Sequence, residues 1–296
     1  MNNFDDLLNT TPKAQTQEPP PIIPNEEFAE KKRAEREELF ETSDEAALKV
    51  ANSGSEFQKF LDAQARIGRY SAVNTLLIME AKPEASRLGD FDYWKEKGCS
   101  IRAGEKGISI LEPNEYTKSD GTPGIGYNVK KVFDISQVDT RKMKPEPQQQ
   151  SHDNRQLLRA LVYNAPLTIR SVDELPNGGG AMTDPQAGEI LVLKGMEFGD
   201  IYRSVANELA LAEIDYDKAV DPNFTAYCAS YVLCKKHGVD TKDYNFESAP
   251  VIFKDMEPKE IKSELSQIRN AADEISGRMA RQLDVADKAA RSQDAR

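Results

Sequence analysis

Few side chains in this sequence of 296 residues have the types and spacing that metal or covalent chemistry needs. The only histidines are His152 and His237, and each stands alone in the sequence. Isolated histidines are more often exposed or helix-ending side chains than metal ligands. The cysteines form no Cys-x-x-Cys pair, and they are Cys99, Cys228 and Cys234. This odd, unpaired set is typical of inert thiols in a reducing cytoplasm, so we expect a cytoplasmic protein.

A group of carboxylates is a second candidate for chemistry. It consists of Glu208, Glu213, Asp215 and Asp217. Carboxylate oxygens suit Mg²⁺ or Ca²⁺, but Glu208 and Asp215 are seven residues apart with Leu211 on the helix face between them, so this is a weak metal site. Without a metal, Glu208 is expected to be a surface or partly paired carboxylate. The sequence has no Walker loop, dinucleotide-binding fingerprint or Gly-x-Ser-x-Gly motif.

The most regular set of cap and turn residues lies in residues 69–111. Ser71 is a good N-cap before an apolar run, so a short helix should begin there and end before Pro83. Residues 91–98 predict a second helical turn that a glycine ends. Two glycines, at positions 104 and 107, bracket a Glu-Lys pair, and an apolar run follows them. This pattern predicts a tight turn that leads into a strand.

The flanking segments predict further helices and a second strand. Glu26–Glu41 is dense in charge and predicts an exposed helix. Ser43 and Ser55 are each expected to cap a further helix. Residues 114–126 contain Asp-Gly and Pro-Gly pairs and predict a loop, and residues 127–133 predict the returning strand.

Several of these residues occur in an order that is known from one protein family. The pieces are Tyr70-Ser71, Asn74, Leu76-Leu77-Ile78, Pro83, Trp94, Gly104-Glu105-Lys106-Gly107-Ile108, Pro113 and Val132-Phe133-Asp134-Ile135-Ser136-Gln137. In this order they resemble the N-terminal domain of the ArdC-type antirestriction proteins. The resemblance covers about a third of the chain, residues 46–140, and departs from the pattern at Val138, where a Thr usually follows the Gln. It implies single-stranded DNA binding and a home on a plasmid, phage or conjugative element.

Basic and aromatic side chains in this region are the candidates for DNA contacts. The candidates for phosphate contacts are Arg66, Arg69, Lys95, Lys97, Arg102, Lys106, Lys130 and Lys131. Tyr70 and Tyr93 are candidates for base stacking, whereas Trp94 is expected to pack in the core. Asn74 suits a DNA contact or a helix-surface or capping hydrogen bond equally well.

The charge distribution allows a modest affinity for DNA. The formal net charge is −11, which by itself argues against nucleic-acid binding. Residues 46–144 nevertheless carry 16 Lys and Arg against 13 Asp and Glu, a net charge of +3, and the remainder carries −14. Binding to DNA should therefore be modest and strongly dependent on salt.

The segment Tyr202–Glu213 follows a predicted hairpin and looks like a zinc-peptidase core, which the ArdC relatives carry after the DNA-binding domain. In the His-Glu-x-x-His motif, two imidazoles on one helix face bind Zn²⁺ and the Glu acts as general base. The imidazole positions here hold Asn207 and Leu211, and only the base position, Glu208, is retained. The third ligand position, on the next helix, holds Tyr227. The resemblance therefore implies a degenerate zincin-like domain, for which we expect no metal, no cofactor and no catalytic residue.

Length and pattern together predict an α+β chain of two domains. Residues 1–43 are expected to form a disordered tail and the exposed charged helix. Residues 44–145 are expected to form the single-stranded DNA-binding domain, with helices packed on a small antiparallel sheet. Residues 146–296 are expected to form the helix-rich zincin-like domain, with a long final helix from Pro258. Residues 144–151, rich in Pro and Gln, predict the linker.

These expectations favour a non-enzymatic single-stranded DNA-binding accessory protein of a mobile element. Two alternatives stay open: a metal-dependent peptidase with an unrecognised site, and an acidic interaction module that acts on a host protein. The expected partners are single-stranded DNA and a host or element-encoded protein. No apolar run approaches the roughly 20 residues that span a bilayer, so we expect no membrane partner.

Overall fold

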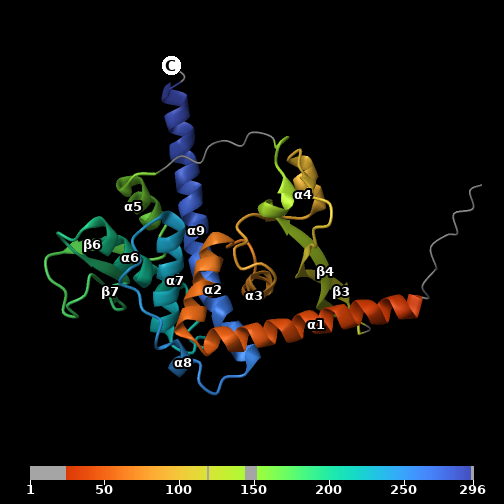
Figure 1. Cartoon of the computed structure of the whole chain (residues 1–296). Coiled ribbons are helices and arrows are strands. Elements are labelled where there is room, and N and C mark those ends of the chain that lie inside the picture. The colour runs from red at the N-terminus through yellow and green to blue at the C-terminus, as the bar shows by residue number, and fades with distance from the viewer. Residues whose placement is uncertain (1–24, 119, 144–151, 295–296) are drawn as a thin grey trace, which may run out of the picture.

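The computed structural model describes residues 25–118, 120–143 and 152–294 (Figure 1). The predicted disordered tail, apart from Asn25, and the predicted linker of residues 144–151 lie outside the described residues. The described part combines helices with small sheets, which confirms the predicted α+β class. Within these ranges, no helix is long and apolar enough to cross a membrane.

The first half contains four helices, a long hairpin and several short strands within the described ranges. Its elements are α1 (Asn25–Ala51), α2 (Gly54–Arg66), α3 (Ala72–Ala81), β1 (Leu88–Gly89), α4 (Phe91–Glu96), β2 (Ser100–Ile101), β3 (Ile108–Thr117), β4 (Pro123–Asp134), the 3₁₀ turn η2 (Ile135–Gln137) and β5 (Val138–Asp139). The strand order of its larger sheet is β1-β4-β3, all antiparallel, and β2 pairs with β5.

The second half places a small mixed sheet beside a group of helices. Its elements are α5 (Asn154–Val162), β6 (Thr168–Val172), β7 (Ala181–Asp184), β8 (Glu189–Leu193), α6 (Phe198–Glu213), α7 (Pro222–His237), α8 (Ala249–Ile252) and α9 (Pro258–Asp294). Strand β8 lies between β6, which is parallel to it, and β7, which is antiparallel. The long helix α9 runs through the middle of the molecule and projects beyond it (Figure 1).

Local sequence signals account for most helix ends. The hydroxyl of Ser71 accepts a hydrogen bond from the Asn74 amide at 3.2 Å, as an N-cap should. Asp221 caps α7 ahead of Pro222, and Gly238 ends that helix in the left-handed conformation with φ of 70°. The start of α3 at Ser71, predicted above, is confirmed, and Asp221, Pro222 and Gly238 are sequence signals of the same local kind.

Helix α1 differs from its prediction because it is continuous through Ser43. That residue was expected to cap a new helix, but it is fully buried inside α1 and its hydroxyl donates to the Phe40 carbonyl at 2.8 Å. The N-cap of α2 is Ser53 in place of Ser55. A buried serine can satisfy its hydroxyl on the preceding turn, so a good capping residue does not by itself start a helix.

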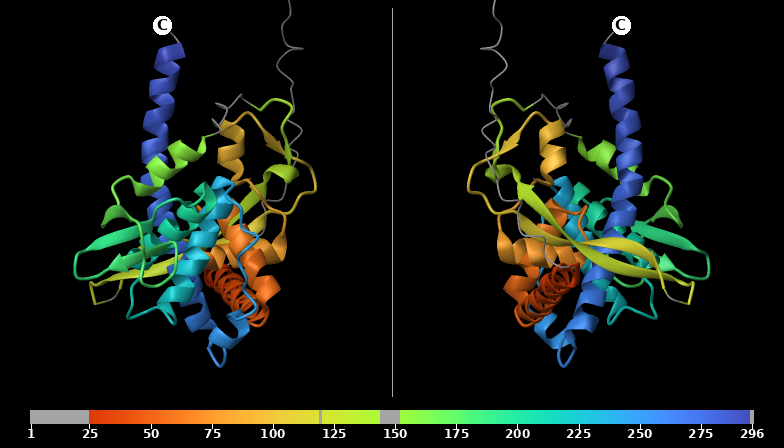
Figure 2. Two further views of the ribbon diagram at one scale, coloured as in Figure 1. Left: turned by 90° about the vertical axis from the view of Figure 1, so that its left-hand side faces the viewer. Right: turned by 90° about the vertical axis from the view of Figure 1, so that its right-hand side faces the viewer.

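The β3–β4 hairpin is also longer than predicted. Residues 114–126 were expected to form a loop, but Asn114 pairs with Gly126 and Thr117 with Pro123. The two strands therefore continue past the Gly and Pro residues that locally disfavour a strand. Pairing with the neighbouring strand supplies the backbone hydrogen bonds and overrides the local preference. Figure 2 shows the hairpin as a twisted ribbon that lies outside the helices.

One hydrophobic core joins the two halves of the chain. Phe57 of α2 is fully buried, and its ring centroid lies 5.6 Å from that of Phe224, 5.7 Å from that of Phe246 and 5.4 Å from that of Phe253. Rings at such separations gain about 0.5–1.5 kcal/mol per pair beyond the burial of their surfaces. An apolar stripe of α9 is buried in the same core, and it comprises Ile261, Leu265, Ile268, Ile275, Met279 and Leu283.

Polar contacts surround this aromatic cluster. The hydroxyl of Tyr231 in α7 donates to Asp62 of α2 at 2.7 Å, and Lys235 pairs with the same carboxylate at 2.9 Å. Lys262 of α9 pairs with Asp44 of α1. That residues 46–145 fold alone remains a prediction, and the shared core implies that such a fragment exposes the Phe57 face of α2.

Replacing Phe57 by Ala should lower the free energy of unfolding by about 3–5 kcal/mol, because a buried ring in contact with three others leaves a cavity. Chemical denaturation of the full chain measures the change. Phe91, which is 59% exposed, serves as the control, and its replacement by Ala should change the free energy by no more than about 0.5 kcal/mol. Equal effects at the two positions would contradict the shared aromatic core.

Candidate functional site

Asn74 connects a helix to the hairpin. Its side-chain amide donates to the Leu111 carbonyl at 2.9 Å and accepts from the Leu111 amide at 2.9 Å. Its side chain is 8% exposed, so both polar atoms are used inside the protein. The structure thus gives this predicted DNA-contact residue a scaffolding bond that fixes α3 on β3.

Asp134 and Gln137 fix the loops around the hairpin base. The Asp134 carboxylate accepts from the backbone amides of Ser86 at 2.8 Å and Arg87 at 3.1 Å, and from the Ser136 amide at 2.9 Å. The Gln137 amide donates to the Lys106 carbonyl at 2.9 Å. These residues of the Phe-Asp-x-x-Gln motif therefore position the chain on either side of the hairpin.

The electrostatics of Asp134 follow from these bonds. Burial alone would raise the pKa of Asp134, but the hydrogen bonds from Ser136, Ser86 and Arg87 together outweigh it and lower the pKa. The carboxylate therefore stays ionised at neutral pH, and both of its oxygens can accept these hydrogen bonds. One of the backbone amides that Asp134 binds belongs to Arg87. Its guanidinium is not among the DNA contacts predicted from the sequence.

Trp94 anchors the short helix α4. The indole is fully buried, as predicted, and its Nε1 donates to the Phe133 carbonyl at 2.9 Å. The neighbouring Tyr93 is half-buried, and its ring lies against Gly89 so closely that a Cβ at that glycine would overlap it. The packing of α4 thus fixes the position of Tyr93.

Around Tyr93 the structure gathers five residues, which we call the cation–aromatic cluster: Arg69, Tyr70, Arg87, Tyr93 and Lys97. The Arg69 guanidinium lies 4.9 Å from the Tyr70 ring centroid and 5.6 Å from that of Tyr93. Arg87 lies 5.9 Å from the Tyr93 centroid, and the Lys97 ammonium lies 5.6 Å from it. Two nitrogens of Arg87 also donate to the Tyr93 hydroxyl, at 3.0 and 3.2 Å. Four members were predicted from the sequence, and Arg87 was missed because it belongs to no motif piece.

The other predicted basic residues lie at separate places around the cluster. Arg66 donates to the carbonyls of Pro83 and Ala85 at 2.8 and 2.7 Å, and Arg102 donates to the Val138 carbonyl at 3.1 Å. These two arginines order loops while their side chains stay exposed. Lys95 and Lys106 are exposed as well.

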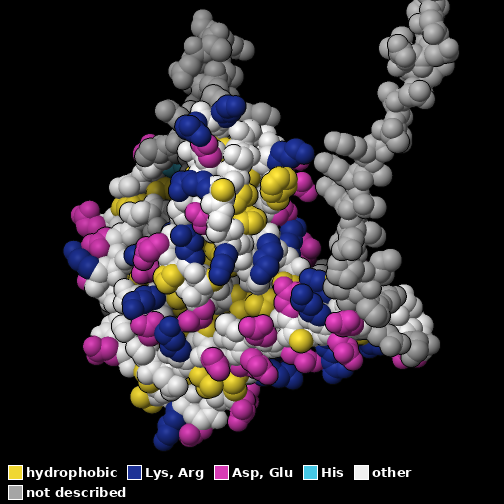
Figure 3. Space-filling view, turned by 45° about the vertical axis from the view of Figure 1, so that its right-hand side comes forward, with side chains coloured by type: hydrophobic (Ala, Val, Ile, Leu, Met, Phe, Trp, Pro, Cys, Tyr) yellow, Lys and Arg dark blue, Asp and Glu magenta, His cyan; other side chains and the backbone are white. Residues whose placement is uncertain are grey.

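Both lysines of strand β4 are already engaged. Lys130 pairs with Glu112 at 2.8 Å and with Asp90 at 3.0 Å, and Lys131 donates to the Ser109 hydroxyl at 2.5 Å. The hydrogen bonds to Glu112 and Asp90 raise the pKa of Lys130. Figure 3 shows the Lys and Arg side chains of this side of the molecule interspersed with Asp and Glu. The basic side chains therefore do not form one continuous patch on this face.

Three of the four positions that the resemblance aligns with a zinc-peptidase core line a cleft of about 430 Å³ in the second half. Asn207 and Glu208 of α6 and Tyr227 of α7 line it, together with Asn177, Gly180, Ala181, Arg203, Ser204, Ser230, Asp243 and Tyr244. Leu211 does not line the cleft and packs against the main core instead. The Glu208 carboxylate accepts from the Thr183 amide at 2.9 Å and from its hydroxyl at 2.7 Å, so it is a partly paired carboxylate.

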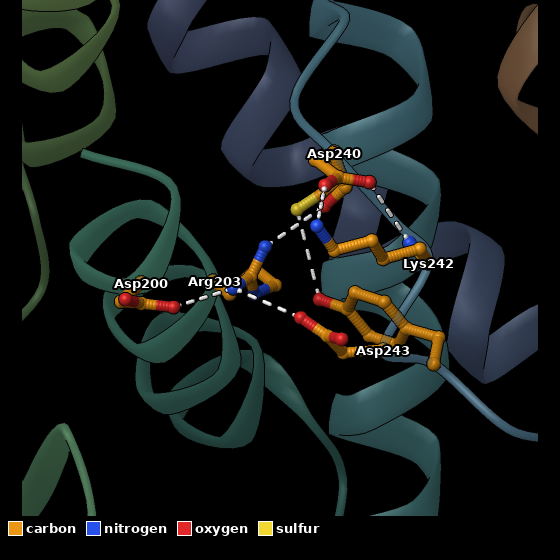
Figure 4. A network of polar contacts seen from close by, with 7 residues as sticks. Asp200, Arg203, Asp240, Lys242 and Asp243 are labelled. Atoms are coloured by element: carbon orange, nitrogen blue, oxygen red, sulfur yellow. Dashed lines mark hydrogen bonds and ion pairs between the residues drawn. The ribbon is translucent and has the colours of Figure 1, made fainter. Parts of the chain in front are cut away.

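Arg203 and Asp243, which line this cleft, belong to a charged network. Figure 4 shows Arg203 between Asp200 on its own helix and Asp240 and Asp243 on the segment after α7. Its guanidinium lies 2.5 Å from the Asp200 carboxylate, 3.4 Å from that of Asp243 and 3.0 Å from the Asp240 carbonyl. Burial and then the Cys234 thiol raise the pKa of Tyr244, which also lines the cleft. The tyrosine side chains here are therefore neutral.

Neither histidine and none of the three cysteines lines this cleft, although the Cys234 thiol lies 3.6 Å from the Tyr244 hydroxyl. The His152 ring pairs with Asp287 at 3.0 Å, and burial lowers the pKa of His237 to about 4, so that ring stays neutral at pH 7. All three cysteines are free and buried, as expected of inert thiols. Among the described residues, no group of three or more His, Cys, Asp or Glu could hold a metal ion.

Comparison with known proteins agrees with the resemblance in the first half. Residues 40–161 match the family model described as the N-terminal domain of anti-restriction factor ArdC. No curated protein matches the chain. Among solved structures, the metal-free antirestriction protein ArdC from plasmid R388 is similar, with 16% identity and a TM-score of 0.46 over 72% of this chain and 86% of that chain. The Mn(II)-bound form gives 16% identity and a TM-score of 0.45 over 71% and 85%.

Replacing Asp134 by Asn should destabilise the protein by about 1–3 kcal/mol at neutral pH, because the new amide nitrogen meets backbone donors. The lowered pKa of Asp134 gives the pH dependence. The stability that the ionised Asp134 contributes is complete above its pKa in the unfolded chain, about 4. This stability is lost as the pH falls through the lower pKa of Asp134 in the folded protein. Denaturation at pH 7 and pH 3 should show the gap between wild type and variant closing in acid. Asp217→Asn, at an exposed position, should show little gap at either pH; a gap for Asp134→Asn that is constant with pH would contradict this account.

Proposed function

Because residues 40–161 carry an ArdC-type N-terminal domain, we propose that the chain is a single-stranded DNA-binding protein that acts in antirestriction for a plasmid, phage or conjugative element. The observation that carries the proposal is the cation–aromatic cluster. It supplies positive charge for phosphates beside two tyrosine rings, the combination that proteins use to bind single strands.

The chemistry of the cluster favours a single strand over a duplex. Arg69, Arg87 and Lys97 converge on Tyr93, so a phosphate beside that ring meets a guanidinium or an ammonium. In a duplex the base faces are stacked on one another, and the rings of Tyr70 and Tyr93 gain no stacking contact there. With about three phosphate contacts, the slope of log K against log salt should be near −2 for a single strand.

The strong net negative charge elsewhere fits this proposal. A chain with a formal net charge of −11 has little general attraction to a polyanion. Affinity then depends on the local contacts of the cluster, which lies within residues 46–144, the segment with a net charge of +3. The acidic remainder supports the alternative of an interaction with a host protein, but its carboxylates are distributed over helices and ion pairs instead of a phosphate-like spacing.

We further propose that the cleft around Glu208 is not catalytic. A catalytic zinc needs three protein ligands and an activated water, and the corresponding positions hold Asn207, Leu211 and Tyr227. Glu208 then has no metal-bound water to deprotonate, and Thr183 occupies one of its oxygens. The second half serves as the packing partner of α2 in this proposal.

The first test is a salt titration with single-stranded and duplex oligonucleotides. The wild type should prefer the single strand, and Arg87→Ala should weaken that binding about tenfold and reduce the salt slope by about 0.7, since one charged contact is lost. Arg155→Ala, which removes one exposed charge from α5, is the matched control and should bind as the wild type does. Thermal unfolding must show that both variants are folded. Equal affinity for duplex and single strand, or an unchanged slope in Arg87→Ala, would count against the cluster.

The second test is elemental analysis of protein purified without chelator. We expect well under one zinc or manganese per chain, and added metal should leave the melting temperature unchanged because no ligand set binds it. Zinc at one per chain that disappears in Asn207→Ala would revive the peptidase alternative.

A further inference from the structure

The part of the β3–β4 hairpin near its turn carries a half-exposed aromatic ring, that of Tyr116. Tyr116 of β3 is 50% exposed and pairs in register with Gly124 of β4. Because directly paired residues share one face of a sheet, the ring lies over that glycine. Gly124 is buried beneath it, although it is only one residue from the start of the strand.

Two glycines provide the flat surface under this ring. A Cβ at Gly124 would lie 2.8 Å from Cζ of Tyr116, and a Cβ at Gly126 would lie 3.5 Å from Cδ1. Glycine within a strand costs stability, and it commonly marks a place where another group must approach closely. Here the approaching group is the Tyr116 side chain, which rests on the backbone of the strand.

The opposite face of the hairpin is braced by helix α1. Tyr127 follows Gly126 and therefore points to the other side of the sheet. Its ring packs edge-on against Phe40 of α1 with centroids 5.7 Å apart. Tyr116 is thus held on a supported strand while half of its surface faces solvent. An ordered, exposed aromatic plane of this kind is the usual platform for an unpaired base.

The same face of β4 leads to the cation–aromatic cluster. Gly126, Asn128 and Lys130 alternate on this face, and Lys130 pairs with Asp90 at 3.0 Å. Asp90 caps α4 by accepting from the Tyr93 amide at 2.8 Å. The strand from Gly124 to Lys130 spans about 20 Å at 3.3–3.4 Å per residue, a distance that several nucleotides cover. Figure 2 shows the hairpin lying across the outside of the helices, as such a track requires.

We propose that Tyr116 stacks on a base of the same single strand whose phosphates are held by the cation–aromatic cluster, with the strand running along β4 from Gly124 to Lys130. The inference rests on the proposed function and adds a second contact point to it. The sequence predicted a loop at Tyr116 and gave no sign of a stacking role. The ring rests on Gly124 and Gly126, eight and ten positions further along the chain, and only strand pairing brings them beneath it.

The test uses the full chain and poly-dT oligonucleotides of increasing length. Tyr116→Ala should weaken binding to long oligonucleotides about 5- to 100-fold, the usual loss for one stacked base. The salt slope should not change, because no phosphate contact is removed. Tyr116→Phe keeps the ring and should bind as the wild type does. Tyr216→Ala removes another exposed tyrosine, 60% exposed on the second half, and should also leave binding unchanged.

Two further measurements keep the proposal independent of folding defects. Gly124→Ala leaves Tyr116 in the sequence but displaces its ring, and it should lower affinity as Tyr116→Ala does. In Tyr116→Trp, the introduced indole should lose fluorescence when DNA is added, against a constant background from the buried Trp94.

The outcomes separate the two proposals. A wild type that does not bind single strands would overturn both. A wild type that binds, with Arg87→Ala impaired and Tyr116→Ala unimpaired at every length, would overturn the platform alone. Quenching of the introduced indole in Tyr116→Trp by a partner protein but not by DNA would likewise overturn the base-stacking assignment.

Discussion

The insertion of Phe57 among Phe224, Phe246 and Phe253 is the contact on which the rest of the structure depends. This packing fixes α2 against α7 and against the segment that follows α7. The contacts of Asp62 with Tyr231 and Lys235 set the position of α2 along α7. The C-terminal end of α2 leads directly into Arg69 and Tyr70. The same packing fixes α7, which brings Tyr227 to the cleft. Both candidate surfaces thus take their positions from one aromatic core.

Elements with local causes were predictable from the sequence, and elements with distant causes were not. Ser71, Asp221, Gly238 and Pro258 each act within one helical turn, and the boundaries that they predict agree with the structure. The outer half of the hairpin depends on pairing between strands, which Gly and Pro patterns do not reveal. The continuity of α1 through Ser43 depends on burial against the core. Neither cause is visible in a window of neighbouring residues.

The family motif led to the right region, but mainly to the residues that build it. Asn74, Asp134 and Gln137 use their polar atoms on backbone groups inside the protein. Of the cation–aromatic cluster, only Tyr70 belongs to a motif piece, and Arg69, Arg87, Tyr93 and Lys97 lie between the pieces. Arg87 is an example, since nothing in its sequence neighbourhood distinguishes it, and only the Asp134 bonds to its backbone bring it to Tyr93. A motif that specifies a scaffold therefore indicates where a site is formed better than which side chains act in it.

The bond between Asn74 and Leu111 has a further consequence for the open edge of the sheet. Strand β3 is an edge strand, and its free amides and carbonyls could pair with a strand of another molecule. The amide of Asn74 occupies both groups of Leu111, and Pro113, two residues along on the same edge, has no N–H to offer. Glu115 adds a charge at the next outward position. At these positions the edge of β3 is therefore closed to strand addition.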